Sequence, residues 1–149
     1  MGGGSDNIAS GNNSVVGGGE VVEANGLRSV VGGGFFNVAD GESSTLSGGS
    51  SNYAGSDHAT ISGGSFNLVS GVYSVISGGF GNVVYDNYGT IGGGWENEAG
   101  DNDGSTTIFT YATVGVGFTN TARGKYAVVG GGDRGCLRSE WKDYIHWTF

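Results

Sequence analysis

Few side chains in this sequence combine the type and the spacing that catalysis or metal binding requires. The histidines His58 and His146 are far apart, and neither has a cysteine or second histidine at a metal-ligand spacing. The stretch 117–126, GFTNTARGKY, holds a Gly-Lys pair, but a phosphate-binding loop needs Ser or Thr after the lysine, where Tyr126 stands. We therefore expect a solvated His58, and we predict no metal, nucleotide or other cofactor site.

The acidic stretch 101–105, DNDGS, could supply oxygen ligands to a calcium ion. It lacks the alternating ligand pattern and the distal glutamate of a calcium loop, so we interpret it as an acidic turn. No arrangement of Ser, His and Asp stands out as a nucleophilic triad, and no carboxylate pair stands out as a general acid and base. We predict that the chain is not an enzyme.

The composition is unusual for a chain of 149 residues. Glycine accounts for 34 of them, proline for none, and charged residues for 13%. Acidic groups outnumber basic ones 14 to 6, a formal charge of -8, which argues against nucleic acid and anionic membrane surfaces as partners. No apolar run approaches the ~20 residues of a membrane-spanning helix, so we predict no membrane insertion. The single cysteine, Cys136, excludes an internal disulfide.

The elements that position these side chains follow from an internal repeat. Glycine runs recur every 15 residues up to Gly92, then after 23 residues at Gly115 and after 15 at Gly130. The longer step equals one period plus eight residues, which we assign to an insertion near 104–111. Residues 1–132 thus hold about nine units, and regularity of this kind indicates a repeat architecture.

Within the unit, four positions are nearly constant. The third residue of each run is glycine, and an aliphatic residue precedes the run. Three residues beyond the last glycine stands an asparagine, with Val22 as the exception, and a small apolar residue follows two positions later. The asparagine positions that we expect to align are Asn37, Asn52, Asn67, Asn82, Asn97 and Asn120.

This pattern predicts an all-β parallel β-solenoid, a β-roll with 15-residue coils in a single stack. A helix is excluded because repeated glycines disfavour it and no apolar period near 3.6 occurs. Short strands stacked on their copies ~4.8 Å apart fit the fixed columns, with glycines at the sharp corners. The asparagine side chains would then form an amide ladder along the axis, interrupted at Val22.

So slender a coil buries little apolar surface, and a second surface is expected to be covered. The strand residue opposite each aliphatic position is always β-branched, which suggests contact with other copies of the chain. We therefore expect a homo-oligomer. The residues of its interface, called the outer stripe below, are Val15, Val30, Thr45, Thr60, Val75, Thr90, Thr113 and Val128.

The unit SVVGGGFFNVADG at 29–41 and the equivalent units of the other repeats resemble the head repeats of trimeric autotransporter adhesins of the YadA-head type. Similar ATVGGG-x-x-N-x-A-x-G strings occur in repeat tracts of bacterial and phage fibre proteins. The resemblance covers about residues 2–132. It implies a left-handed roll, three chains around one axis, and a place at the cell or virion surface.

Two further features lie outside the constant positions. Aromatic residues follow the glycine corner, and we interpret them as a shielding stack, with a carbohydrate or protein contact strip as the alternative. The tail 133–149 is expected to cap the last coil or to dock onto the next subunit. The tail residues assigned to this role are Trp141, Tyr144, Trp147 and Phe149.

Together these patterns favour a non-enzymatic extracellular fibre module. A stiff trimeric rod would display its surface multivalently to a glycan or a host-surface protein, and such rods could join end to end into filaments. The alternative is an ice-binding solenoid whose threonines at 45, 60, 90 and 113 order water on one flat face.

Overall fold

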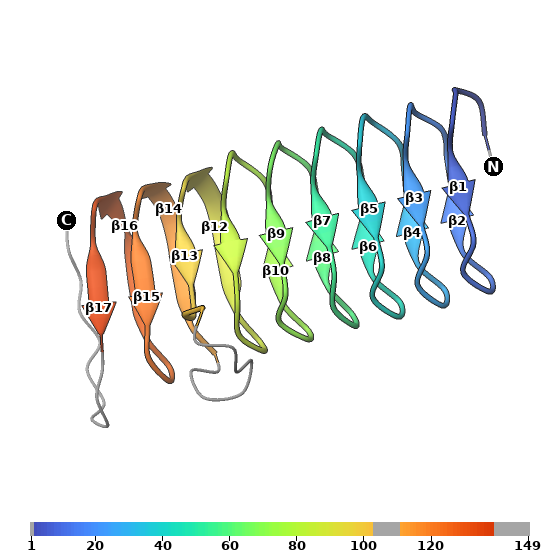
Figure 1. Ribbon diagram of the computed structural model, residues 1–149. Helices are drawn as coiled ribbons and strands as arrows, with labels where there is room; N and C mark the ends of the chain where they lie inside the picture. Colours follow the sequence, from blue (N-terminus) through green and yellow to red (C-terminus); the bar gives the residue numbers. More distant parts are fainter. Residues whose placement is uncertain (1, 103–110, 139–149) are drawn as a thin grey trace.

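The computed structural model describes residues 2–102 and 111–138, and these wind into one continuous stack of about eight turns (Figure 1). Each turn takes about 15 residues and contributes one strand to each of two parallel sheets. The described residues contain no helix, and therefore none that could cross a membrane. The predicted all-β parallel β-solenoid is confirmed.

Sheet A has eight strands, each paired in parallel with the equivalent strand one turn away. The pairing joins identical positions of successive units, for example Val75 to Thr90 and Ile76 to Ile91. The strands are β2 (Val15–Val16), β4 (Val30–Val31), β6 (Thr45–Leu46), β8 (Thr60–Ile61), β10 (Val75–Ile76), β12 (Thr90–Trp95), β14 (Thr113–Phe118) and β16 (Val128–Asp133).

Sheet B has nine strands with the same parallel register and lies on the other side of the coil. The strands are β1 (Ile8–Ala9), β3 (Glu23–Ala24), β5 (Val38–Ala39), β7 (Tyr53–Ala54), β9 (Leu68–Val69), β11 (Val83–Val84), β13 (Glu98–Ala99), β15 (Thr121–Arg123) and β17 (Cys136–Arg138). Most strands of both sheets have only two residues, because the coil must turn again at once.

The core is a narrow double column between the sheets. Because side chains alternate along a strand, each strand sends one residue inward and its neighbour outward. Sheet A supplies the larger inward residues, such as Leu46 and Ile76, and sheet B supplies mainly alanines, such as Ala54; all three are fully buried. Each turn thus buries one residue from each sheet, and the pairs range from Val31 with Ala39 to Ile76 with Val84.

An asparagine ladder runs beside this core. Asn37, Asn52, Asn67, Asn82, Asn97 and Asn120 are all buried. From Asn52 on, each asparagine donates its backbone N–H and its Nδ2–H to the Oδ1 of the asparagine one turn earlier, at 2.9–3.2 Å. The Nδ2 groups also donate to carbonyls of the glycine runs, such as Asn82 Nδ2 to Gly94 O at 3.0 Å. The ladder therefore satisfies buried polar groups of both the side chains and the corner.

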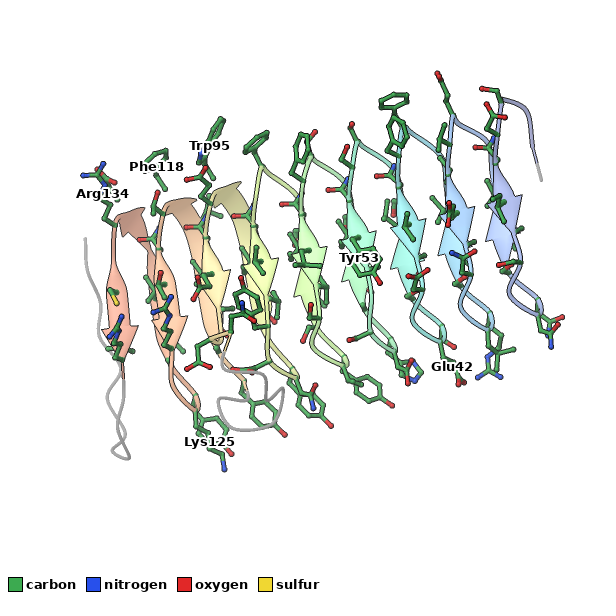
Figure 2. The ribbon with its side chains drawn as sticks, viewed as in Figure 1. Glu42, Tyr53, Trp95, Phe118, Lys125 and Arg134 are labelled. Carbon is green, nitrogen blue, oxygen red and sulfur yellow. The ribbon has the colours of Figure 1, made fainter. Side chains whose placement is uncertain are left out.

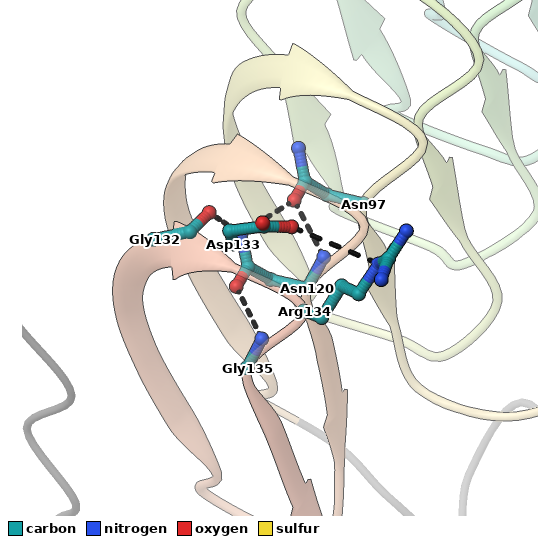
Figure 3. A network of polar contacts seen from close by, with 6 residues as sticks. All are labelled: Asn97, Asn120, Gly132, Asp133, Arg134 and Gly135. Atoms are coloured by element: carbon teal, nitrogen blue, oxygen red, sulfur yellow. Dashed lines mark hydrogen bonds and ion pairs between the residues drawn. The ribbon is translucent and has the colours of Figure 1, made fainter.

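The ladder has one interruption and one defined end. Val22 occupies the asparagine position in its turn, is fully buried, and offers no side-chain oxygen to the turn above. At the other end, Asn120 donates to Gly132 O and its Oδ1 accepts the Gly135 N–H at 2.8 Å (Figure 3). The adjacent Arg134 and Asp133 form a 3.8 Å ion pair whose side chains are both largely exposed, so it adds little stability.

The glycine corner contains two kinds of glycine, as Gly48 and Gly49 show. Gly49 has a φ of +94°, and a Cβ built on it would lie 2.1 Å from the Gly64 carbonyl oxygen. A Cβ on the neighbouring Gly48 would meet nothing within 4 Å. Gly49 is therefore required by the stacking of the chain on itself, whereas Gly48 leaves bare backbone at the surface.

The limits of the repeat differ from those expected at two places. Tyr111, expected at the end of the insertion, occupies the regular position one turn after Tyr88, as their stacked rings show. The solenoid also continues past residue 132, since β17 pairs with β15 through Cys136 and Thr121. The predicted tail residues Trp141, Tyr144, Trp147 and Phe149 lie outside the described residues, as does most of the insertion.

Candidate functional site

The outer stripe lies on the outward face of sheet A. Its eight residues are in register from turn to turn, so the side chains form one row along the axis. Val15, Val30 and Thr90 are exposed, and the other five members are partly exposed. The row contains two adjacent threonine pairs, Thr45 with Thr60 and Thr90 with Thr113, separated by Val75.

Small residues flank the outer stripe on the same face. Two positions further along each turn stands a glycine or serine, exposed in seven of the eight turns and partly exposed in the other. These residues are Gly17, Gly32, Ser47, Ser62, Ser77, Gly92, Gly115 and Gly130. Neither row contains an ionisable side chain, so the part of sheet A that these two rows cover, called the sheet A face below, is weakly polar and uncharged. The exposed Asp133 at the end of β16 lies outside both rows.

The outward face of sheet B is different because it carries charge. Glu98 accepts a hydrogen bond from Arg123 Nε at 2.8 Å, and this bond is the main cause of the raised pKa of Arg123. Tyr53 donates from its hydroxyl to Asp40 Oδ2 at 2.8 Å, which raises the pKa of Tyr53. A solvated face of this kind favours display over packing against a like-charged copy.

Aromatic residues gather on the edge that follows the glycine runs, called the glycine edge. Phe35 and Phe36 meet edge to face with ring centroids 4.2 Å apart. A second group continues over four turns from Phe66 through Phe80 and Trp95 to Phe118, with centroids 4.3–6.5 Å apart. Figure 2 shows Trp95 and Phe118 projecting along this edge. Ser50 and Ser51 separate the two groups.

The opposite edge carries a more regular stack, which we call the tyrosine edge. It consists of His58, Tyr73, Tyr88, Tyr111 and Tyr126. Successive ring centroids lie 4.4–5.6 Å apart and the planes differ by only 2–16°. Figure 2 shows Lys125 on this edge, and its Nζ lies 5.2 Å from the centroid of Tyr126.

The backbone at the tyrosine edge is strained. All five residues have a left-handed φ, between 56° and 67°, which costs an ordinary residue about 1 kcal/mol. In earlier turns the same position holds Asn13, Arg28 and Ser43, also with positive φ. We did not predict this stack from the sequence, although the 15-residue spacing of His58, Tyr73 and Tyr88 indicated that these rings align.

The residues first considered for chemistry do not come together. His58 stacks on Tyr73 at the tyrosine edge, and Lys125 lies four rungs away. Asp101 and Asn102 are described, but the rest of the DNDGS stretch and His146 are not. Among residues 2–102 and 111–138, no three His, Cys, Asp or Glu side chains are grouped so that they could hold a metal ion.

Neither the models of known protein families nor the curated proteins contain a match to this chain.

Proposed function

We propose that the chain is a structural module of an extracellular, surface-displayed fibre, in which three left-handed coils pack around one axis through the outer stripe. The observation that carries this proposal is the contrast between the two sheet faces. A chain with a formal charge of -8 repels its own copies, and the sheet A face is the broad face without ionisable side chains. Copies that meet there avoid the carboxylates of sheet B and of the edges.

The size of this face supports three copies over two. Eight strands ~4.8 Å apart and about four residues wide give a footprint of roughly 450 Å². Stable interfaces bury about 800 Å² per partner, so a flat pair formed by this face alone would be marginal. In a trimer each chain has two neighbours, which would also cover the corners beside this face, and the bare backbone at glycines such as Gly48 lets a neighbouring chain approach closely there. The resemblance of the repeat to adhesin heads also supports a trimer.

An adhesive role is supported by the surfaces that stay exposed in such a trimer. With sheet A covered, sheet B and the two edges would repeat their side chains every turn on three chains. Weak contacts to a partner would then be multiplied. The rings of the tyrosine edge, and Phe80 with Trp95 at the glycine edge, stack and cover much of one another's faces, whereas sugars pack on open aromatic faces. We therefore favour a host-surface protein over a glycan as the partner. Rods of this kind could also join end to end into filaments.

Ice binding is supported less well. An ordered water layer needs an unbroken threonine row, and valines occupy four of the eight positions of the outer stripe. Val75 separates the two threonine pairs.

A matched pair of arginine substitutions tests the trimer. Thr60→Arg places a charge on the sheet A face, and Thr121→Arg places the same charge on the sheet B face, where the threonine is also partly exposed. We expect Thr60→Arg to abolish the cross-linked trimer because three like charges would be buried around the axis, while Thr121→Arg keeps it. Chemical cross-linking followed by sedimentation velocity measures this. Equal behaviour of the two variants would contradict the assignment of the interface.

A further inference from the structure

The tyrosine edge is an exposed aromatic stack whose ring identities the fold does not require. The same corner forms with asparagine, arginine and serine in the turns of Asn13, Arg28 and Ser43. Asparagine adopts a left-handed φ more readily than tyrosine does, so a purely conformational requirement would favour residues of that kind. Tyrosine nevertheless occupies four consecutive turns, from Tyr73 to Tyr126.

The stack remains continuous across the insertion. Tyr88 and Tyr111 are 23 residues apart in the chain, yet their rings stack with centroids 4.8 Å apart and planes 10° from parallel. The eight additional residues therefore leave the register of this edge intact. The exposed rings form a row about five rungs long, or roughly 20 Å at the spacing of parallel strands.

The orientation of the rings determines what they can bind. Because the faces stack on one another along the axis, the row presents ring edges and phenol oxygens to solvent. The outward phenol oxygens carry lone pairs and favour positive charge on a ligand, while the coplanar edges favour a flat surface. A row of coplanar edges therefore fits the broad face of one flat, extended, conjugated molecule lying along the axis. A sugar ring, which packs on aromatic faces, does not fit it.

Charge at the two ends of the row distinguishes them. At the His58 end lie the exposed Asp57, whose Oδ1 accepts the Glu42 N–H at 2.9 Å, and the carboxylate of Glu42 itself, which pairs with Arg28. At the Tyr126 end lies Lys125. The His58 end therefore has a net negative charge and the other end a positive one, and the chain as a whole is acidic.

We propose that the tyrosine edge is a binding site for elongated, planar, conjugated aromatic cations. The ligand lies face-on against the ring edges of Tyr73, Tyr88 and Tyr111, with its positive charge toward Asp57. This site is separate from the outer stripe, and it does not depend on the proposed trimer.

Thioflavin T, a rod-shaped planar benzothiazole cation, is a suitable probe, and its fluorescence rises when it is held flat. Titration of the full chain should give a saturable increase. Tyr88→Asn splits the row into two short segments at a position where asparagine suits the backbone, and we expect it to weaken binding at least tenfold. Tyr73→Asn, which isolates His58 from the remaining tyrosines, should weaken it similarly. Circular dichroism checks that both variants stay folded.

Three further variants test whether probe binding depends on the tyrosine edge. Tyr53→Asn removes an exposed tyrosine outside the row and should leave the affinity unchanged. Tyr88→His restores a flat ring of the kind already stacked at His58, and should recover most of the binding. Asp57→Asn should weaken binding several-fold at low salt and less at high salt.

The proposal is overturned if the full chain binds no probe, or if Tyr88→Asn and Tyr53→Asn bind alike. Retained binding in Thr60→Arg is expected, and it separates this site from the trimer.

Discussion

The turns before residue 57 and the turns after it share one interior but have different edges. Inside, Val31 and Leu46 in the first group correspond to Ile76 and Ile91 in the second, and all four are fully buried. Outside, the corner position changes from polar residues such as Ser43 to stacked aromatic rings. The inward-facing residues therefore specify the coil, while the outward-facing residues are free to differ along the rod.

Exposed aromatic residues are also distributed unevenly between the two groups of turns. Both aromatic edges are richest in the second group of turns, where Tyr73, Tyr88, Phe80 and Trp95 lie within two units of each other. The first group carries polar contacts instead, such as the exposed Arg28–Glu42 pair, which contributes little to stability. Under the proposed function, the early turns would act mainly as a spacer and the later turns as the display region.

The largest effect is expected from a pair of substitutions in one corner. Gly49→Ala places a methyl group against the Gly64 carbonyl oxygen at a φ of +94°, and it should destabilise the fold by at least about 3 kcal/mol. Gly48→Ala meets no atom within 4 Å, so the free energy of unfolding of the single chain should change by less than about 0.5 kcal/mol. Urea denaturation followed by circular dichroism measures both values.

The same two substitutions also separate glycines required by the coil from glycines required by a neighbouring chain. If Gly48→Ala leaves folding intact but weakens association, the middle glycine is required by a neighbouring chain and not by the coil itself. Similar destabilisation of both variants would contradict the division of the corner into a buried and a bare glycine.

A smaller, stabilising effect is expected at position 22, where valine replaces the asparagine found in the neighbouring turns. Val22→Asn would supply the missing rung between Asn7 and Asn37, giving the Asn37 amides an acceptor as in the later turns. The gain of buried hydrogen bonds should exceed the loss of one valine and raise the free energy of unfolding by about 1 kcal/mol. Differential scanning calorimetry would show a higher Tm. A lower Tm would indicate that valine at this position contributes packing that the ladder cannot replace.

Much of the fold was predictable because stacking makes equivalent positions contact one another. The period, the glycine corners and the asparagine positions all follow from residues that meet their own copies one turn away. The limits of the repeat were harder to predict: residue 135 is Gly in place of asparagine, and Leu137 replaces the small residue, yet β17 pairs and Leu137 packs against the core. A single turn at the end of the stack tolerates such departures because backbone pairing still holds it.

The tyrosine edge was not predicted from the sequence, for a physical reason. Its position accepts Asn13, Arg28 and tyrosine alike, because the left-handed corner constrains the backbone and not the side chain. The insertion also hides the 15-residue spacing between Tyr88 and Tyr111. The structure was needed to show that these rings are parallel and adjacent.

Sedimentation equilibrium of the unmodified chain at micromolar concentration tests the central claim most directly. If copies associate through the uncharged face of sheet A, the mass should be three times that of the 15.0 kDa chain, and added salt should not dissociate the trimer because no ion pair holds that face. A single species with the mass of one chain, at low and high salt alike, would contradict the account.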